Sequence, residues 1–176
     1  MRIFTAIPLP QAIKDKFTEI SRGKLPIPYV NTGNFHITLN FLGELETDQV
    51  EMVKNFWENG LPEIRKFWIE YDKVIKFRQQ LHMTIKENKK LNDLHLLLRD
   101  KFTAMGYKAS FPKYYAHTTI GNLHMDKVMN KERKIDNFPN EDLKQLSFEA
   151  ESIVMYESKL LLHHAKYIPL AEHKLV

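Results

Sequence analysis

Strand-like segments outnumber helical ones in this chain, and their order restricts the fold more than any other feature. Alternation with a period of two marks residues 1–9, 35–41, 67–77, 81–86, 117–120, 146–159 and 165–175, whereas helical spacing marks 10–21, 47–59 and 91–105. Few of these helices could cross repeatedly between parallel strands, so the order predicts an α+β fold with mainly antiparallel sheets. No Gly-, Ser- or Pro-rich linker divides the chain, and we expect one domain over residues 1–176 with two lobes.

The composition excludes several classes of function. The 176 residues include no Cys, which excludes disulfides, thiol nucleophiles and Cys-ligated metal sites. The six Gly are scattered, so neither a G-x-G-x-x-G nucleotide motif nor a P-loop is present. No segment approaches ~20 consecutive apolar residues and no signal-peptide pattern is visible, so we expect a cytoplasmic protein without a membrane span. A formal net charge of +4 favours anionic partners such as phosphates or RNA.

A His-x-Thr motif occurs three times, at His36-Ile37-Thr38, His82-Met83-Thr84 and His117-Thr118-Thr119. Composition alone predicts about 0.4 matches. Positions i and i+2 of a strand share one face, about 6.5–7 Å apart, so an imidazole and a hydroxyl can converge on one ligand. Two such pairs from two lobes would place two imidazoles on opposite sides of a bound group. Periodicity does not say which two of the three motifs form the pair.

Two opposed imidazoles suit phosphodiester chemistry without a metal. A neutral imidazole can take a proton from the nucleophile while a protonated one delivers a proton to the leaving oxygen, and an ordinary pKa near 6.5 lets both forms coexist near neutrality. The Thr hydroxyls would stabilise charge on the non-bridging phosphoryl oxygens. A single His on a strand is more often structural, and it is the repetition that favours a functional interpretation.

Four blocks of sequence carry a family pattern: MRIFTAIPLP at 1–10, NFHITLNFLGE at 34–44, YAHTTI at 115–120, and the closing YESKL and AKYIPL at 156–160 and 165–170. They resemble the 2H phosphoesterases, and among these the bacterial and archaeal RNA 2′,3′-cyclic phosphodiesterases, once described as 2′-5′ RNA ligases. The resemblance covers most of the chain. It implies two pseudo-symmetric lobes with helices packed outside and an active-site cleft between them.

The resemblance also implies the site residues and the reaction. The catalytic histidines would be His36 and His117, and the phosphate contacts would come from Thr38 and Thr119. The implied reaction is hydrolysis of an RNA terminal 2′,3′-cyclic phosphate to a 2′-phosphomonoester. His82 is then expected to be structural, because the family usually has a core strand at that position.

The chain departs from the family pattern at several positions. Gly121 and Asn122 stand where an arginine is common after the second motif, and Asn40 replaces an arginine after the first. Tyr29 takes the place of an upstream Trp, and His163-His164 replaces a turn that contains Pro or Gly. Without these arginines, Thr38 and Thr119 are the phosphate contacts that the resemblance transfers to this chain.

Other functions stay open as alternatives. A metal site lacks H-E-x-x-H or related spacing, and acyl transfer by Ser158 lacks a G-x-S-x-G elbow. A non-catalytic RNA-binding module could use a basic loop, although nearby carboxylates cancel much of its charge; the loop contains Lys127, Lys131, Arg133 and Lys134. The same chemistry could act on another cyclic nucleotide or on a 2′-5′ linked oligonucleotide. We expect a monomer that needs neither metal nor cofactor.

Overall fold

Two antiparallel sheets and three α-helices form most of the fold in the computed structural model, which describes residues 1–176 except 23, 26–30, 108–113, 123–134, 136–137 and 162–164. The strands are β1 (Arg2–Pro8), β2 (His36–Glu44), β3 (Phe67–Ile69), β4 (Tyr71–Phe77), β5 (Gln80–Ile85), β6 (His117–Asn122), β7 (Phe148–Ala150), β8 (Ser152–Leu160) and β9 (Ala165–Lys174). The helices are α1 (Gln11–Ser21), α2 (Thr47–Asn59) and α3 (Lys89–Ala104), with 3-10 helices η1 (Thr32–Asn34) and η3 (Asn140–Leu146).

The strands are arranged in one four-stranded sheet, β2-β1-β8-β9, one three-stranded sheet, β4-β5-β6, and the pair β3-β7. Every pairing among these strands is antiparallel. The predicted α+β class with antiparallel sheets is therefore confirmed. The strands expected at 67–77 and 146–159 are each divided in two, because at each junction the chain leaves the small β3-β7 pair and enters a larger sheet while its alternation continues.

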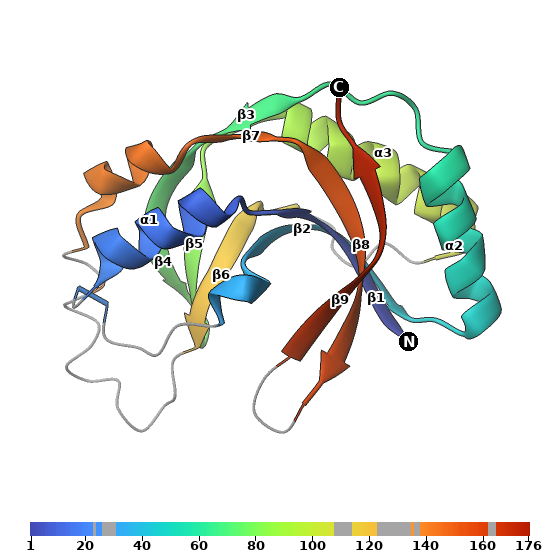
Figure 1. Cartoon of the computed structure of the whole chain (residues 1–176), viewed down its shortest axis with the longest axis horizontal. Helices are drawn as coiled ribbons and strands as arrows, with labels where there is room; N and C mark the ends of the chain where they lie inside the picture. Colours follow the sequence, from blue (N-terminus) through green and yellow to red (C-terminus); the bar gives the residue numbers. More distant parts are fainter. Residues whose placement is uncertain (23, 26–30, 108–113, 123–134, 136–137, 162–164) are drawn as a thin grey trace.

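The helices lie on the outside of the two sheets (Figure 1). Helix α2 contacts β9 and α3 contacts β2, whereas α1 contacts η3, which in turn contacts β4. Helices α2 and α3 also pack together through parallel Trp57 and Phe102 rings, 6.5 Å apart. The residues 47–59 marked by helical spacing form α2, and Glu46 is its N-cap because it forms a reciprocal capping box with Gln49.

One cluster of buried apolar side chains draws on both sheets. It includes Ile3 and Ile37 from the four-stranded sheet and Leu81 and Met83 from the three-stranded sheet, each at most 1% exposed. A shared core is expected of a single domain. The assignment of residues 1–176 to one two-lobed domain stays a prediction. Among the described residues, none of the helices is long and apolar enough to cross a membrane.

Strand β2 does not keep the face alternation that its sequence predicts. Ala6 pairs with Thr38 and Thr5 pairs with Asn40, so Leu39 is an extra residue on β2 and forms a β-bulge. Beyond the bulge the faces exchange, and Asn40 is buried beside the α3 residue His95. Strict alternation over residues 35–41 predicts that Asn40 shares a face with His36 and Thr38; this is wrong, and the bulge is the reason.

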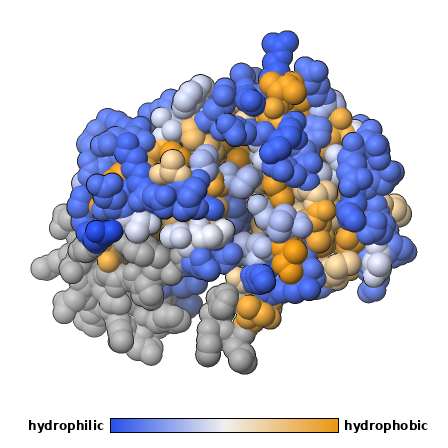
Figure 2. Space-filling view, in the orientation of Figure 1, coloured by the Kyte–Doolittle hydropathy of each residue, from blue (hydrophilic) through white to orange (hydrophobic). Residues whose placement is uncertain are grey.

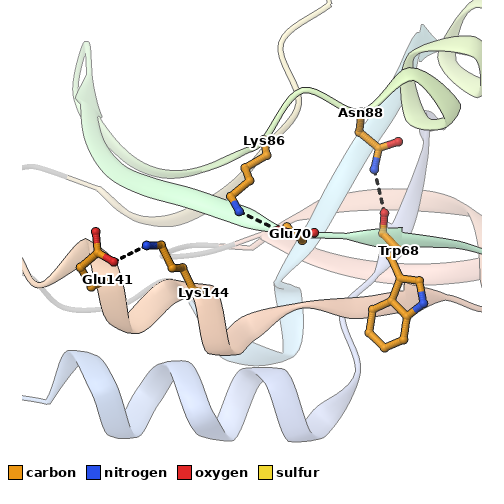
Figure 3. A network of polar contacts seen from close by, with 6 residues as sticks. All are labelled: Trp68, Glu70, Lys86, Asn88, Glu141 and Lys144. Carbon is orange, nitrogen blue, oxygen red and sulfur yellow. Dashed lines mark hydrogen bonds and ion pairs between the residues drawn. The ribbon is translucent and has the colours of Figure 1, made fainter.

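Polar contacts fasten the junction between β3 and β4 (Figure 3). Lys86, just after β5, binds the Glu70 carboxylate at 2.6 Å, and the Asn88 amide donates to the Trp68 carbonyl at 2.7 Å. Lys86 and Glu70 are about half exposed, so solvent screens this ion pair and it contributes little to stability. Most of the described surface seen in Figure 2 is similarly hydrophilic, with apolar side chains showing in smaller groups.

Candidate functional site

The first His-x-Thr motif begins strand β2 and fixes the orientation of its imidazole at both ring nitrogens. Nδ1 of His36 lies 2.6 Å from the Asn34 carbonyl oxygen. Because a carbonyl only accepts, Nδ1 carries the hydrogen, and Nε2 accepts from the Thr38 hydroxyl at 3.0 Å. The expected imidazole and hydroxyl pair is therefore formed in the structure.

Aromatic rings enclose His36 on the four-stranded sheet. The Phe4 ring lies 5.0 Å from the imidazole, and the Tyr167 ring meets it edge-on at 5.1 Å. The Asn34 side chain donates to the Ala165 carbonyl at 2.6 Å, so the residue that accepts from His36 is itself tied to β9. These contacts leave the His36 ring little freedom to rotate.

The second His-x-Thr motif, at the start of β6, repeats the construction of the first. Nδ1 of His117 donates to the Tyr115 carbonyl at 2.8 Å, which is again the carbonyl two residues before the histidine. Thr118 is fully buried and its hydroxyl is bonded to Tyr71 at 2.7 Å, which anchors the strand. Thr119 lies on the same face as His117, as the strand period requires.

The tertiary structure brings the first and second motifs together. Strands β2 and β6 are in contact, and the Tyr114 hydroxyl donates to the Thr38 carbonyl at 3.0 Å. Tyr114 also stacks on His95 of α3, with ring centroids 4.0 Å apart. Strand β2, which carries the first motif, is thereby joined to the residue that leads into the second motif.

Burial lowers the pKa values of both imidazoles. The pKa of His36 falls to about 4, mainly through desolvation, with smaller effects from the positive charges of His117 and Lys14 opposing the bond to Asn34. Desolvation also lowers the pKa of His117, against the bond to Tyr115. Both rings are therefore neutral near pH 7 in the free protein, and a bound phosphate would favour a proton on one of them.

The third motif has a different construction. Nε2 of His82 donates to the Gln80 side chain at 3.1 Å, whereas Thr84 is bonded to the backbone of Lys73 on β4. The Thr84 hydroxyl is thus occupied by strand pairing. His82 is only 2% exposed, but its ring stacks on that of His117 with centroids 3.9 Å apart.

Several contacts at the site escaped sequence reasoning. Tyr114 and Tyr115 directly precede the second motif, and that position was their only signal. The residues that replace the family's arginines do not extend the site, because Asn40 is buried and Asn122 accepts from Gln80 at 3.4 Å.

Other sequence features lie outside the described residues, namely Tyr29, His163, His164 and the basic loop with Lys127, Lys131, Arg133 and Lys134. In the part of the chain that is described, three or more His, Asp or Glu side chains nowhere gather as metal ligands would.

The geometry agrees with a known family. The sequence model described as LigT like Phosphoesterase matches residues 7–85, a segment that contains β2 with the first motif. Over this segment the chain is similar to the LigT-like phosphoesterases of the 2H family. The second motif, on β6, lies beyond the matched segment, and it is the tertiary structure that joins it to the first.

Two relatives with similar sequences cover two thirds or nearly all of this chain. An RNA 2′,3′-cyclic phosphodiesterase of Methanocaldococcus jannaschii is 27% identical over 168 residues, which cover 91% of this chain and 92% of the relative. One of Bacillus subtilis is 25% identical over 126 residues, 66% of this chain and 68% of the relative. The crystal structure of E. coli LigT with 3′-AMP superposes with a TM-score of 0.75 at 19% identity, over 99% of this chain and 97% of the other.

Proposed function

We propose that this protein is a 2H phosphoesterase that hydrolyses RNA ends carrying a 2′,3′-cyclic phosphate and releases a 2′-phosphomonoester. Water attacks phosphorus, a P–O bond forms, and the bond from phosphorus to the 3′ oxygen breaks. One imidazole, neutral at Nε2, takes the proton of the attacking water, and the other, protonated by the time of reaction, gives its Nε2 proton to the 3′ oxygen. His36 and His117 are the two imidazoles, and Thr38 and Thr119 donate to the non-bridging oxygens.

The repeated construction of the two motifs carries this proposal. In each, the carbonyl two residues before the histidine holds Nδ1–H, so the unprotonated nitrogen is Nε2. One ring can then accept a proton at Nε2 while the other donates a proton from the same atom in a single displacement. This step needs no metal, and the names of the two relatives support RNA cyclic phosphate as the substrate.

Aromatic side chains beside His117 favour a substrate that has a base. Phe77 and Tyr115 are 47% and 45% exposed, and their ring centroids lie 6.4 Å apart. Tyr115 also lies 5.6 Å from the His117 ring. Half-exposed rings near a phosphate site can stack on the terminal nucleobase, which supports a nucleotide over a simple phosphodiester.

The test is hydrolysis of an RNA oligonucleotide with a 2′,3′-cyclic end in excess EDTA. His36→Ala and His117→Ala should each lower kcat about 10²–10⁴-fold, because each removes one partner of the acid–base pair. His173→Ala, which changes a β9 histidine outside all three motifs, is the matched control and should keep wild-type kcat. Chromatography of the product should give the 2′-phosphate.

Other results would contradict parts of the proposal. Loss of turnover in EDTA with recovery on adding a divalent cation would overturn the metal-independent mechanism. A 3′-phosphate product would show that the 2′ oxygen, and not the 3′ oxygen, is the leaving group. If the wild type binds the RNA but leaves it intact, the same assay with a 2′-5′ linked oligonucleotide or a small cyclic nucleotide separates another substrate from a non-catalytic RNA-binding module.

A further inference from the structure

The third motif lies against the second across two paired strands. On β5 and β6, His82 pairs with Thr119 and Thr84 pairs with His117. Directly paired residues of an antiparallel ladder share one face, so these four side chains form a compact group on one side of the sheet. The diagonal of this group joins His82 to His117, and their rings are nearly parallel, at 14°, with centroids 3.9 Å apart.

His82 is itself held in one orientation. Its Nε2 donates to Gln80 at 3.1 Å, and the Gln80 amide donates in turn to Asn122 at 3.4 Å on β6. The ring of Phe77 lies 5.5 Å away. Nδ1 of His82 is buried and has no hydrogen-bond partner among the described residues. A proton on Nδ1 would give a buried charge without a partner beside His117, so the His82 ring is neutral.

The two candidate catalytic imidazoles differ in how they are fixed. His36 is bonded at both nitrogens and contacts the rings of Phe4 and Tyr167. His117 has one side-chain hydrogen bond within the described residues, through Nδ1 to Tyr115. That single bond permits the ring to swing about it. The stacked face of His82 restricts this motion, and a misplacement of about 1 Å can cost ~10²-fold in rate.

We infer that His82 is a positioning residue that holds the His117 imidazole in its productive orientation by stacking. It takes no proton in the reaction, since its Nε2 is bonded to Gln80 and its Nδ1 is buried. The inference rests on the proposed role of His117. It replaces the expectation that the His82-Met83-Thr84 motif is only structural.

The test compares two apolar replacements of similar size. His82→Phe keeps a flat aromatic ring, whereas His82→Leu removes it, and both lose the bond to Gln80. We expect His82→Leu to lower kcat about 10-fold or more with KM within about 3-fold, and His82→Phe to stay within about 3-fold of wild-type kcat. Met83→Val, a buried change on the opposite face of β5, is the control for lost stability and should keep wild-type kcat at a lower Tm.

Two kinetic outcomes would overturn the inference. Equal kcat in the wild type, His82→Phe and His82→Leu would return His82 to a structural role. Equal loss in both variants would assign the effect to the imidazole nitrogens instead of the stack. An inactive wild type would contradict the proposed function itself, and the NMR measurement below would still test the stack.

Imidazole NMR of the wild-type protein tests the stack without any variant. Labelled histidine should show His82 as the neutral Nε2–H tautomer and an upfield ring-current shift on the His117 ring protons. The His117 signals should shift downfield and broaden in His82→Leu but not in His82→Phe. Unshifted His117 protons in the wild type would show that the rings are not stacked and would overturn the inference.

Discussion

At the scale of single residues, the two catalytic candidates are made equivalent by their own backbone. Each histidine donates Nδ1–H to the carbonyl two residues earlier, from Asn34 or from Tyr115, and this local bond chooses the tautomer. The sequence could not choose between Thr118 and Thr119 by residue type alone. Burial does so, since Thr118 is bonded to Tyr71 inside the fold and Thr119 stays on the face of His117.

The pKa values of these two residues predict an acidic optimum. Desolvation lowers the pKa of His36 to about 4 and lowers that of His117 from 6.5. As the pH rises, each imidazolium of the free enzyme therefore loses its proton before pH 6.5 is reached. The reaction needs one proton on the pair, so kcat/KM should be bell-shaped with both limbs below pH 6.5. Rates measured from pH 3.5 to 9 at low substrate check this. A flat profile from pH 5 to 9 would contradict the two-histidine mechanism.

At the scale of elements, one tyrosine joins the two sheets at the site. Tyr114 leads into β6, donates to the Thr38 carbonyl in β2, and stacks on His95 from α3. His95 is in turn bonded to the Leu39 carbonyl at 2.8 Å, at the β-bulge. The bulge therefore turns backbone of β2 toward α3, and the relative position of the two motifs depends on this contact.

Removal of the Tyr114 hydroxyl should disturb catalysis more than folding. Tyr114→Phe keeps the stacked ring but leaves the Thr38 carbonyl without its donor, and we expect about 1 kcal/mol of lost stability together with about 3- to 10-fold lower kcat. Tyr107→Phe is the matched control, because the Tyr107 hydroxyl also donates to a backbone carbonyl, that of Gln49 at 3.3 Å. It should lose similar stability in urea unfolding with unchanged kcat. Equal kcat in both variants would show that the Tyr114 hydroxyl plays no part in catalysis.

At the scale of the whole molecule, the two sheets share a core and the chain ends are fastened to it. The Val176 amide donates to the Ile64 carbonyl and its carbonyl accepts from the Lys66 amide, while Leu175 donates to the Glu151 carbonyl. The last strand is thereby tied to the segments that flank β3 and β8. We propose that residues 1–176 unfold as one cooperative, monomeric unit.

The stability of this unit should depend on pH through its buried histidines. The folded-state pKa values of His36 and His82 are lowered to about 4, below the unfolded value of 6.5, so the unfolded state binds more protons between these limits. Stability should fall as pH drops from 6.5 toward 4, with at most about 1.4 kcal/mol per pH unit for His36 and a smaller slope for His82. Urea unfolding of the wild type and His82→Phe should show a shallower slope in the variant. Parallel slopes would contradict a neutral His82.

The sequence by itself determined the α+β class, most strands and helices, and three His-x-Thr motifs as candidates for the site, because strand and helix periods and a repeated motif are local signals. It did not determine how β3 and β7 separate from their neighbours, or that Leu39 is a bulge that buries Asn40, because sheet membership and register depend on partners far along the chain. It also did not reveal that His82 stacks on His117. Only the pairing of β5 with β6 places these residues together, since they are separated by a helix in sequence and joined by a ladder in space.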